Sequence, residues 1–249
     1  MAIDIKLGSY VFGNEISDFE VEEDSRVDQV AVPRRDGFLS DEAYRSGMKI
    51  RLSGLICEDT DTEARAAINN LRNAFGKGKK NLTLYNDRQA EVQRSYFSYR
   101  YVDGDMRRIE WEGELVSDDF GFVSTSPTEQ EETINANPET NIFTNNGNLE
   151  TSAIIRITAG GANIATGLRI DNLTNAKFFT INQQIDAGDW VEIDTDLLTV
   201  VDQSGANVLA AFQGDFFKLE PGDNSIKWTG TATSSPLLKF TYRDKYDGA

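Results

Sequence analysis

Apolar and polar side chains alternate along much of the chain, which is the pattern of β-strands that bury one face. The stretch Lys49–Ile56 shows this clearly. Ile50 and Leu52 fall on one side of the predicted strand, and Arg51 and Ser53 fall on the other. Because the alternation returns in many short runs, we predict a mainly β protein.

One stretch, directly after that strand, has the spacing of a helix instead. The polar residues Asp59–Glu63 offer oxygens to the free N–H groups of a helix N-terminus and complement its positive end. An apolar stripe at helical spacing follows, made of Ala64, Ala67, Ile68, Leu71, Ala74 and Phe75. Gly76 then permits the left-handed turn that ends many helices. We predict one short helix over residues 62–75, followed by a strand at Asn81–Tyr85.

Turn residues between apolar runs predict further strands. Asp103-Gly104-Asp105 separates Glu91–Tyr101 from Arg107–Val116 and predicts a hairpin. Beyond residue 150, turn residues interrupt short apolar runs at regular intervals, which predicts a β-sandwich or jelly roll. The strands predicted there are Ala153–Ile157, Leu168–Asn172, Lys177–Ile181, Trp190–Ile193, Leu198–Val201, Phe216–Leu219, Ile226–Trp228 and Leu237–Tyr242.

The composition changes near the middle of the chain. Residues 124–147 are rich in Ser, Thr, Glu and Asn, and their few apolar residues show no period. Such a stretch is typical of an interdomain connection. We therefore predict a β-rich N-terminal domain at residues 1–123, a polar linker at 124–147 and a C-terminal β-sandwich domain at 148–249.

The 249-residue chain has 41 acidic and 25 basic side chains, a formal net charge of −16. This balance argues against specific nucleic-acid binding, because phosphate contacts need clustered Lys and Arg. The acidity serves either solubility alone or a surface that lies beside DNA without adhering to it. No run approaches the roughly 20 apolar residues of a membrane helix, and the N-terminus lacks a signal-peptide pattern. We expect synthesis in a cytoplasm and no membrane insertion.

The sequence carries no recognisable catalytic motif. Histidine is absent and Cys57 is the single cysteine, which excludes Ser-His and Cys-His nucleophile pairs and internal disulfides. We expect Cys57 to be a small apolar group that closes a buried strand. The acids in Asp59–Glu63 fail the calcium-loop template. Asp194 and Asp196 share one face of a strand or turn, but we expect no metal there. We predict no enzyme activity, no metal and no cofactor.

Two sets of short motifs stand in a fixed order along the chain. The N-terminal set is Pro33–Gly37, Ile50–Ile56, Leu71–Phe75 and Tyr85–Arg88. The C-terminal set is Gly147-Asn148, Ile170–Thr174, Asp189–Thr195 and Phe217–Ile226. Together they resemble the distal tail proteins of long, flexible-tailed bacteriophages, over nearly the whole chain. The sequence departs from that family at Asp118–Gly121, where a proline is expected after the aspartate.

The resemblance implies an N-terminal domain that assembles into a six-membered ring, with a galectin-like sandwich on the outside. Such rings lie at the virion tail tip, join the tail tube to the baseplate or adhesion apparatus, and let DNA pass. Carboxylates lining the opening would keep phosphate from adhering. The implied partners are further copies of the chain in single or stacked rings, the tail tube protein, the tail-associated hub protein and fibre or receptor-binding proteins.

Two groups of residues are candidates for contacts. Pro33, Arg34, Arg35 and Asp36 are candidates for contacts between ring subunits, since arginine suits the carboxylates of a neighbour; simple solvation of the two arginines is the alternative. Trp190 and Trp228 are glycan-stacking candidates if the protein is instead a carbohydrate-binding module, although tryptophan is more frequent in cores. Galectin-like folds commonly bind sugar through sites that contain histidine, which this chain lacks.

Overall fold

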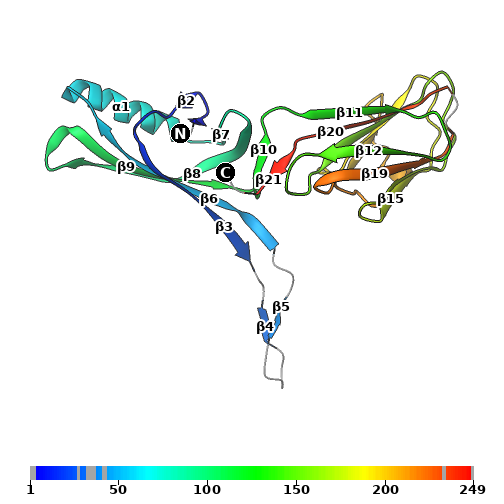
Figure 1. Ribbon diagram of the computed structural model, residues 1–249, viewed down its shortest axis with the longest axis horizontal. Coiled ribbons are helices and arrows are strands. Elements are labelled where there is room, and N and C mark those ends of the chain that lie inside the picture. The colour runs from blue at the N-terminus through cyan, green and yellow to red at the C-terminus, as the bar shows by residue number, and fades with distance from the viewer. Residues whose placement is uncertain (1–3, 27–28, 32–37, 41–43, 232–233, 248–249) are drawn as a thin grey trace. The chain divides into compact units, whose positions relative to one another are not determined.

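The computed structural model describes residues 4–26, 29–31, 38–40, 44–231 and 234–247, and the chain forms two units (Figure 1). The N-terminal unit comprises Met1–Thr125 with Asp247–Ala249, and the C-terminal unit comprises Ser126–Tyr246. The described residues contain many strands and a single α-helix, α1 (Asp61–Ala74). The prediction of a mainly β chain with one short helix is confirmed. No described helix is long and apolar enough to cross a membrane.

An antiparallel sheet with the strand order β2-β1-β7-β8-β9-β6-β3 forms the N-terminal unit. In addition, β10 pairs with residues Arg88 and Gln89 at the start of β8. Its strands are β1 (Ile5–Leu7), β2 (Tyr10–Val11), β3 (Ile16–Arg26), β6 (Tyr44–Cys57), β7 (Lys80–Leu84), β8 (Arg88–Val102), β9 (Asp105–Ser117) and β10 (Phe122–Ser124). Between β3 and β6, β4 (Gln29–Ala31) and β5 (Phe38–Ser40) form a separate antiparallel pair. The β8–β9 hairpin turns at Asp103 and Gly104, which both have positive φ, as the predicted turn requires.

The helix begins and ends one residue earlier than predicted. Thr60 is its N-cap, and the Thr60 hydroxyl accepts a hydrogen bond from the Glu63 N–H while a Glu63 carboxylate oxygen accepts one from the Thr60 N–H. This reciprocal pair satisfies two N–H groups that lack partners within the helix. At the other end, Lys80 Nζ donates to the carbonyl oxygens of Asn73 (3.0 Å) and Ala74 (2.6 Å). Local chemistry therefore limits the helix at both ends.

The apolar side of α1 covers one face of the N-terminal sheet. Ala64, Ile68 and Leu71 of the helix are buried in one core with residues of the sheet. The sheet supplies alternate positions of its long strands, namely Ile50, Leu52 and Ile56 of β6 and Ile109, Trp111 and Leu115 of β9. Because alternate residues of a strand point to opposite faces, the remaining residues of these strands lie on the face away from α1.

The C-terminal unit is a sandwich of two five-stranded antiparallel sheets, with the orders β11-β20-β13-β16-β17 and β12-β19-β14-β15-β18. The first contains β11 (Thr128–Thr133), β13 (Ala153–Thr158), β16 (Trp190–Asp194), β17 (Thr199–Asp202) and β20 (Leu237–Tyr242). The second contains β12 (Glu139–Asn145), β14 (Leu168–Asn172), β15 (Lys177–Ile181), β18 (Phe212–Gly214) and β19 (Gly222–Thr229). Both sheets contribute inward residues to one core, including Ile155, Phe240, Phe179 and Trp228. A short 3-10 helix (Leu209–Ala211) precedes β18, and β21 (Lys245–Tyr246) ends the unit.

The predicted linker at residues 124–147 differs from the structure. Most of it forms β11 and β12, which are edge strands of the two sandwich sheets and pair with β20 and β19. An edge strand gains its backbone hydrogen bonds from one neighbour and needs few apolar side chains; β11 has no buried residue. The predicted strand Phe216–Leu219 is also wrong, because the strand lies at Phe212–Gly214. Phe217 and Leu219 are buried in the core outside any strand.

Candidate functional site: the uncovered face of the N-terminal sheet

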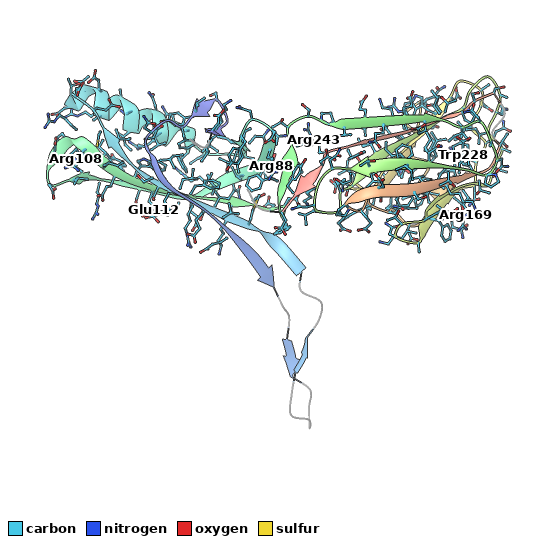
Figure 2. All side chains as sticks on the ribbon, in the orientation of Figure 1. Arg88, Arg108, Glu112, Arg169, Trp228 and Arg243 are labelled. Carbon is cyan, nitrogen blue, oxygen red and sulfur yellow. The ribbon has the colours of Figure 1, made fainter. Side chains whose placement is uncertain are left out.

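Among the side chains that the structure describes, the face of the N-terminal sheet away from α1 has no buried member along β3, β6, β8 and β9. We call it the uncovered face. Its members are Asp18, Glu20 and Glu22 of β3, Lys49, Arg51, Ser53, Leu55 and Cys57 of β6, Arg108, Glu110, Glu112 and Glu114 of β9, and Tyr96, Ser98 and Arg100 of β8. Figure 2 shows Glu112 on the side of the sheet opposite α1. The face is therefore a polar surface rather than part of a core.

Strand register sets the members of this face in rows across the sheet. Tyr96, Glu114, Arg51 and Glu20 form one row, because each is the direct partner of the next. The neighbouring row is Ser98, Glu112, Ser53 and Asp18. Side chains directly opposite on one face lie about 5 Å apart at Cβ and interact. Charges from strands far apart in sequence therefore meet.

Arg51 is the centre of the largest group of charges on this face. Its Nη1 lies 2.6 Å from Glu22 Oε1 and 3.9 Å from Glu20 Oε2, and its Nε lies 3.4 Å from Glu114 Oε2. These carboxylates raise the pKa of Arg51, with Glu22 the largest cause. The pKa of Glu114 is lowered from its ordinary value of 4.5, first by a hydrogen bond from the Ser95 side chain and then by Arg51. All of these side chains are partly exposed, so each single pair contributes little to stability.

The uncovered face keeps more negative charge than it neutralises. It carries six carboxylates and four basic groups. Arg100 pairs with Glu110, its Nε donating to Glu110 Oε2 at 2.6 Å. Glu112 and Asp18 have no ion-pair partner among the residues that the structure describes. These two unpaired carboxylates, Glu112 and Asp18, lie in the same row across the sheet, with Ser53 between them.

A shallow groove of about 650 Å³ crosses the same face. Its lining includes Ser53, Leu55, Ser98, Arg100, Glu110 and Glu112. It is open, its lining mixes these polar side chains with Leu55, Tyr99 and Trp111, and it lacks the enclosed apolar walls of a small-molecule pocket. Its shape and chemistry suit a macromolecular surface better than a buried ligand.

The structure places the predicted site residues in very different settings. Pro33, Arg34, Arg35 and Asp36 lie outside the described residues. Trp228 is 0% exposed in the sandwich core, so it has no face on which a sugar could stack (Figure 2). Trp190 is half-buried on the outer side of β16, with the Arg156 guanidinium carbon 4.4 Å from its ring centroid. Of the two tryptophans, Trp190 alone remains a surface residue.

The remaining chemical candidates do not assemble into a site. Asp194 Oδ1 accepts from the N–H groups of Asp196 and Leu197, both at 2.9 Å, and so shapes the turn after β16. No group of three Asp, Glu or Cys side chains in the described part of the chain is arranged to hold a metal. Cys57 is exposed, contrary to the expectation of a buried thiol, because it falls on the polar side of β6.

The sequence alone did not point to the uncovered face as a candidate site, although the alternation of residues in two of its strands is visible in the sequence. Glutamate stands at every second position from Glu110 to Glu114, and basic or hydroxyl residues alternate with apolar ones from Lys49 to Ser53. These patterns predict a polar strand face. They do not say that β3, β6, β9 and β8 lie side by side.

Comparison with known proteins identifies the C-terminal part. The family model of the siphovirus-type tail component, C-terminal domain, matches residues 146–246, so this part of the chain is similar to that domain. The match ends at Tyr246, which is also the last residue of the C-terminal unit. No curated protein sequence matches the chain.

Solved structures extend the likeness to the N-terminal unit. The crystal structure of SPP1 Dit (gp 19.1), described as a paradigm of hub adsorption apparatus in Gram-positive infecting phages, is similar with a TM-score of 0.72 at 14% identity. The match covers 97% of this chain and 98% of that one, so the two share their fold throughout.

Two further structures are more distant. A chain from the virion of a native gene transfer agent particle has a TM-score of 0.32 at 14% identity, with 50% of this chain and 95% of that one covered. A chain from the activated baseplate of phage P2 with Ca has a TM-score of 0.37 at 10% identity, with 100% and 99% covered. Neither is similar enough to support an argument about this chain.

Proposed function

We propose that this chain, which carries the C-terminal domain of siphovirus-type tail components, is a structural hub subunit at the tip of a phage tail. Six copies form a ring that joins the tail tube to the baseplate or adhesion apparatus and lets DNA pass. The ring contacts the tail tube protein, the tail-associated hub protein and fibre or receptor-binding proteins. The C-terminal sandwich, galectin-like in type, lies on the outside of this ring. The protein performs no catalysis.

The family match of residues 146–246 is the observation that carries this proposal. It supports a tail-component role for the C-terminal unit, and the fold shared with SPP1 Dit extends over the N-terminal unit, which the family model does not cover. Fold alone does not fix function. The family match supplies the functional part of the argument, and the whole-length likeness supports one protein type for both units.

The test is the mass of the purified full-length protein by light scattering, together with electron micrographs of the same fraction. We expect a mass of six chains, or twelve for stacked rings, and annular particles. A monodisperse monomer that persists over a hundredfold range of concentration, alone and with tail tube protein, would contradict the proposal. Concentration must be varied because the stability of an obligate ring depends on it.

The uncovered face is our candidate for the lining of the ring opening. The net charge itself does not single out the N-terminal unit, because both units carry −8: 25 acidic against 17 basic side chains in the N-terminal unit, and 16 against eight in the C-terminal unit. The local arrangement supports the assignment, since the face away from α1 is polar and has surplus carboxylates. Like charges repel a phosphate backbone and keep DNA moving.

Carboxylate-to-amide substitutions test this lining. A chain with E110Q, E112Q and E114Q should form rings that retain double-stranded DNA at low salt, whereas the unmodified ring should not. The matched control carries E131Q, D196N and D215N, three amide substitutions at exposed acids of the C-terminal unit. Equal DNA retention by both variants would attribute the effect to net charge and would contradict the proposed lining.

Carbohydrate binding is the second candidate function, and it now depends on Trp190 alone. The ring of Trp190 is partly exposed and stands beside Arg156 and Glu192, whose polar groups could bond sugar hydroxyls. Cell-wall saccharides should then quench tryptophan fluorescence in the full chain but not in a Trp190→Ala variant. Quenching that survives this substitution, or no quenching at all, would remove this candidate.

A further inference from the structure

We propose that the free edge of β12 in the C-terminal unit is a docking site for an extended, basic segment of a partner protein, which adds to the sandwich as a further strand. The inference goes beyond the proposed hub role, because it stands on the C-terminal unit alone and does not depend on a ring. Partner strands bind sheet edges in this way through backbone hydrogen bonds, while their alternate side chains give specificity.

β12 presents unused backbone groups along its outer edge. Within the described residues it is the last strand of its sheet and pairs with β19 alone. In an antiparallel pair, alternate residues direct their N–H and C=O groups away from the partner strand. Thr144 is such a residue, since the side-chain amide of Gln130 accepts from its N–H at 2.9 Å and donates to its carbonyl oxygen at 3.4 Å. Thr140 and Ile142 have the same orientation, and no described residue bonds their outward groups.

The other outer strands of the sandwich are protected against such pairing. β11 carries three glutamates among its six residues, and charged side chains blunt a sheet edge. β17 is covered in part, since the Val208 N–H donates to the Val200 carbonyl oxygen at 2.9 Å. β18 is only three residues long. β12 has seven residues, and its sequence carries no charge from Thr140 to Asn145, so its edge lacks these forms of protection.

An exposed apolar row on the outer face of this sheet begins at β12. Ile142 is the direct partner of Ser225, and the Leu173 N–H donates to the Ser225 carbonyl oxygen. Ile142 and Leu173 therefore lie on either side of Ser225, and they are 51% and 52% exposed. A side chain of the added strand directly opposite Ile142 would extend this row and remove part of it from water.

A carboxylate beside the edge favours a basic segment. Gln130 and Glu132 are two residues apart on β11 and therefore point to the same side of that strand. The short connection at residues 134–138 reverses the chain, so the path along β11 from Gln130 to Glu132 leads from Thr144 back toward Ile142. Glu132 has no ion-pair partner among the described residues. A lysine or arginine of the added strand would supply one.

A synthetic peptide tests the edge in the full-length chain. The probe is a labelled hexapeptide with blocked ends, in which alternating valine and threonine follow one lysine, and fluorescence anisotropy measures its binding. Thr140→Pro removes an outward N–H without removing a hydrogen bond to β19. It should weaken binding about tenfold. Thr140→Val is the matched control, because it keeps the N–H, and it should bind the peptide as the unmodified chain does.

Two carboxylate-to-amide variants test the charge. Glu132→Gln should weaken binding of the lysine peptide by about twofold to fivefold, the range of a partly exposed ion pair. Glu131→Gln, on the opposite side of β11, should leave binding unchanged. This pair of variants tests the site even where the proline variant fails to fold. Equal binding by both variants would overturn the basic character of the segment.

Hydrogen exchange locates the bound peptide. At saturating peptide the N–H groups of Thr140 and Ile142 should exchange about tenfold more slowly, whereas that of Phe143, which faces β19, should change little. No binding at about 1 mM peptide, or binding without this protection, would overturn the proposal. Dimers that Thr140→Pro abolishes would assign the edge to a second copy and would also overturn it. Each of these outcomes leaves the hub function to its own test.

Discussion

The ring of Phe75, the residue that caps the C-terminus of α1, fills the space over Gly113 of β9. A Cβ atom at position 113 would lie 2.4 Å from Phe75 Cε1 and 2.6 Å from its Cζ. The same ring packs against Phe97 and Trp111, with centroids 4.9 Å and 6.0 Å away. Gly113 therefore provides the site at which the helix end docks on the sheet.

Gly113→Ala should destabilise the N-terminal unit by about 1–3 kcal/mol, because the added methyl overpacks a rigid aromatic cluster. Hydrogen exchange in β6 and β9 should accelerate, while the strands of the C-terminal unit serve as an internal control. Gly161→Ala is the matched variant, since its Cβ would meet only ordinary contacts at 3.5 Å or more. A Gly113→Ala chain as stable as Gly161→Ala would contradict this packing.

Thr60→Ala should cost about 1 kcal/mol, because it removes the N-cap oxygen of α1 and the partner of Glu63. Thr62→Ala provides the control on the same helix, since Thr62 is exposed inside the first turn and alanine is a better helix former. Denaturant unfolding followed by circular dichroism compares the two. An equal decrease in the free energy of unfolding in both variants would show that the cap does not stabilise the helix.

The lowered pKa of Glu114 predicts an acid-dependent loss of stability. A depressed carboxyl pKa stabilises the folded state above the ordinary value of 4.5, and this contribution is lost as the pH falls below it, through the folded pKa. Glu114→Gln should therefore flatten the dependence of unfolding free energy on pH below about 4.5. A Glu114→Gln chain whose stability has the same pH dependence below 4.5 as the unmodified chain would refute the assignment.

Asn224 is buried and fixes the turn that leads into β19. Its Oδ1 accepts from the Glu220 N–H at 2.9 Å, and its Nδ2 donates to the carbonyl oxygens of Glu220 at 2.8 Å and Gly222 at 3.1 Å. Asn224→Ala should cost about 1–3 kcal/mol, because it leaves buried backbone groups without partners. Asn175→Ala removes two hydrogen bonds, but both are exposed, so it should cost less. Thermal unfolding that ranks them in the opposite order would contradict this role.

Much of the fold was predictable because its signals are local. The ends of α1 follow from Thr60, Glu63 and the apolar stripe, all within one segment. The β8–β9 hairpin follows from Asp103 and Gly104, whose positive φ suits the turn. The candidate site was less predictable. Arg51 meets Glu22 and Glu114 from 29 and 63 residues away, and no local pattern encodes that distance.

The sequence by itself determined the β character, the helix, the main hairpin and the family resemblance, since each depends on side-chain periodicity or on short motifs. Tertiary structure alone decided that residues 128–133 and 139–145 are strands, because their hydrogen bonds come from β20 and β19 far along the chain. It also decided which tryptophan is buried, since Trp190 and Trp228 both stand in alternating strands. The face that points inward depends on which sheet packs against which.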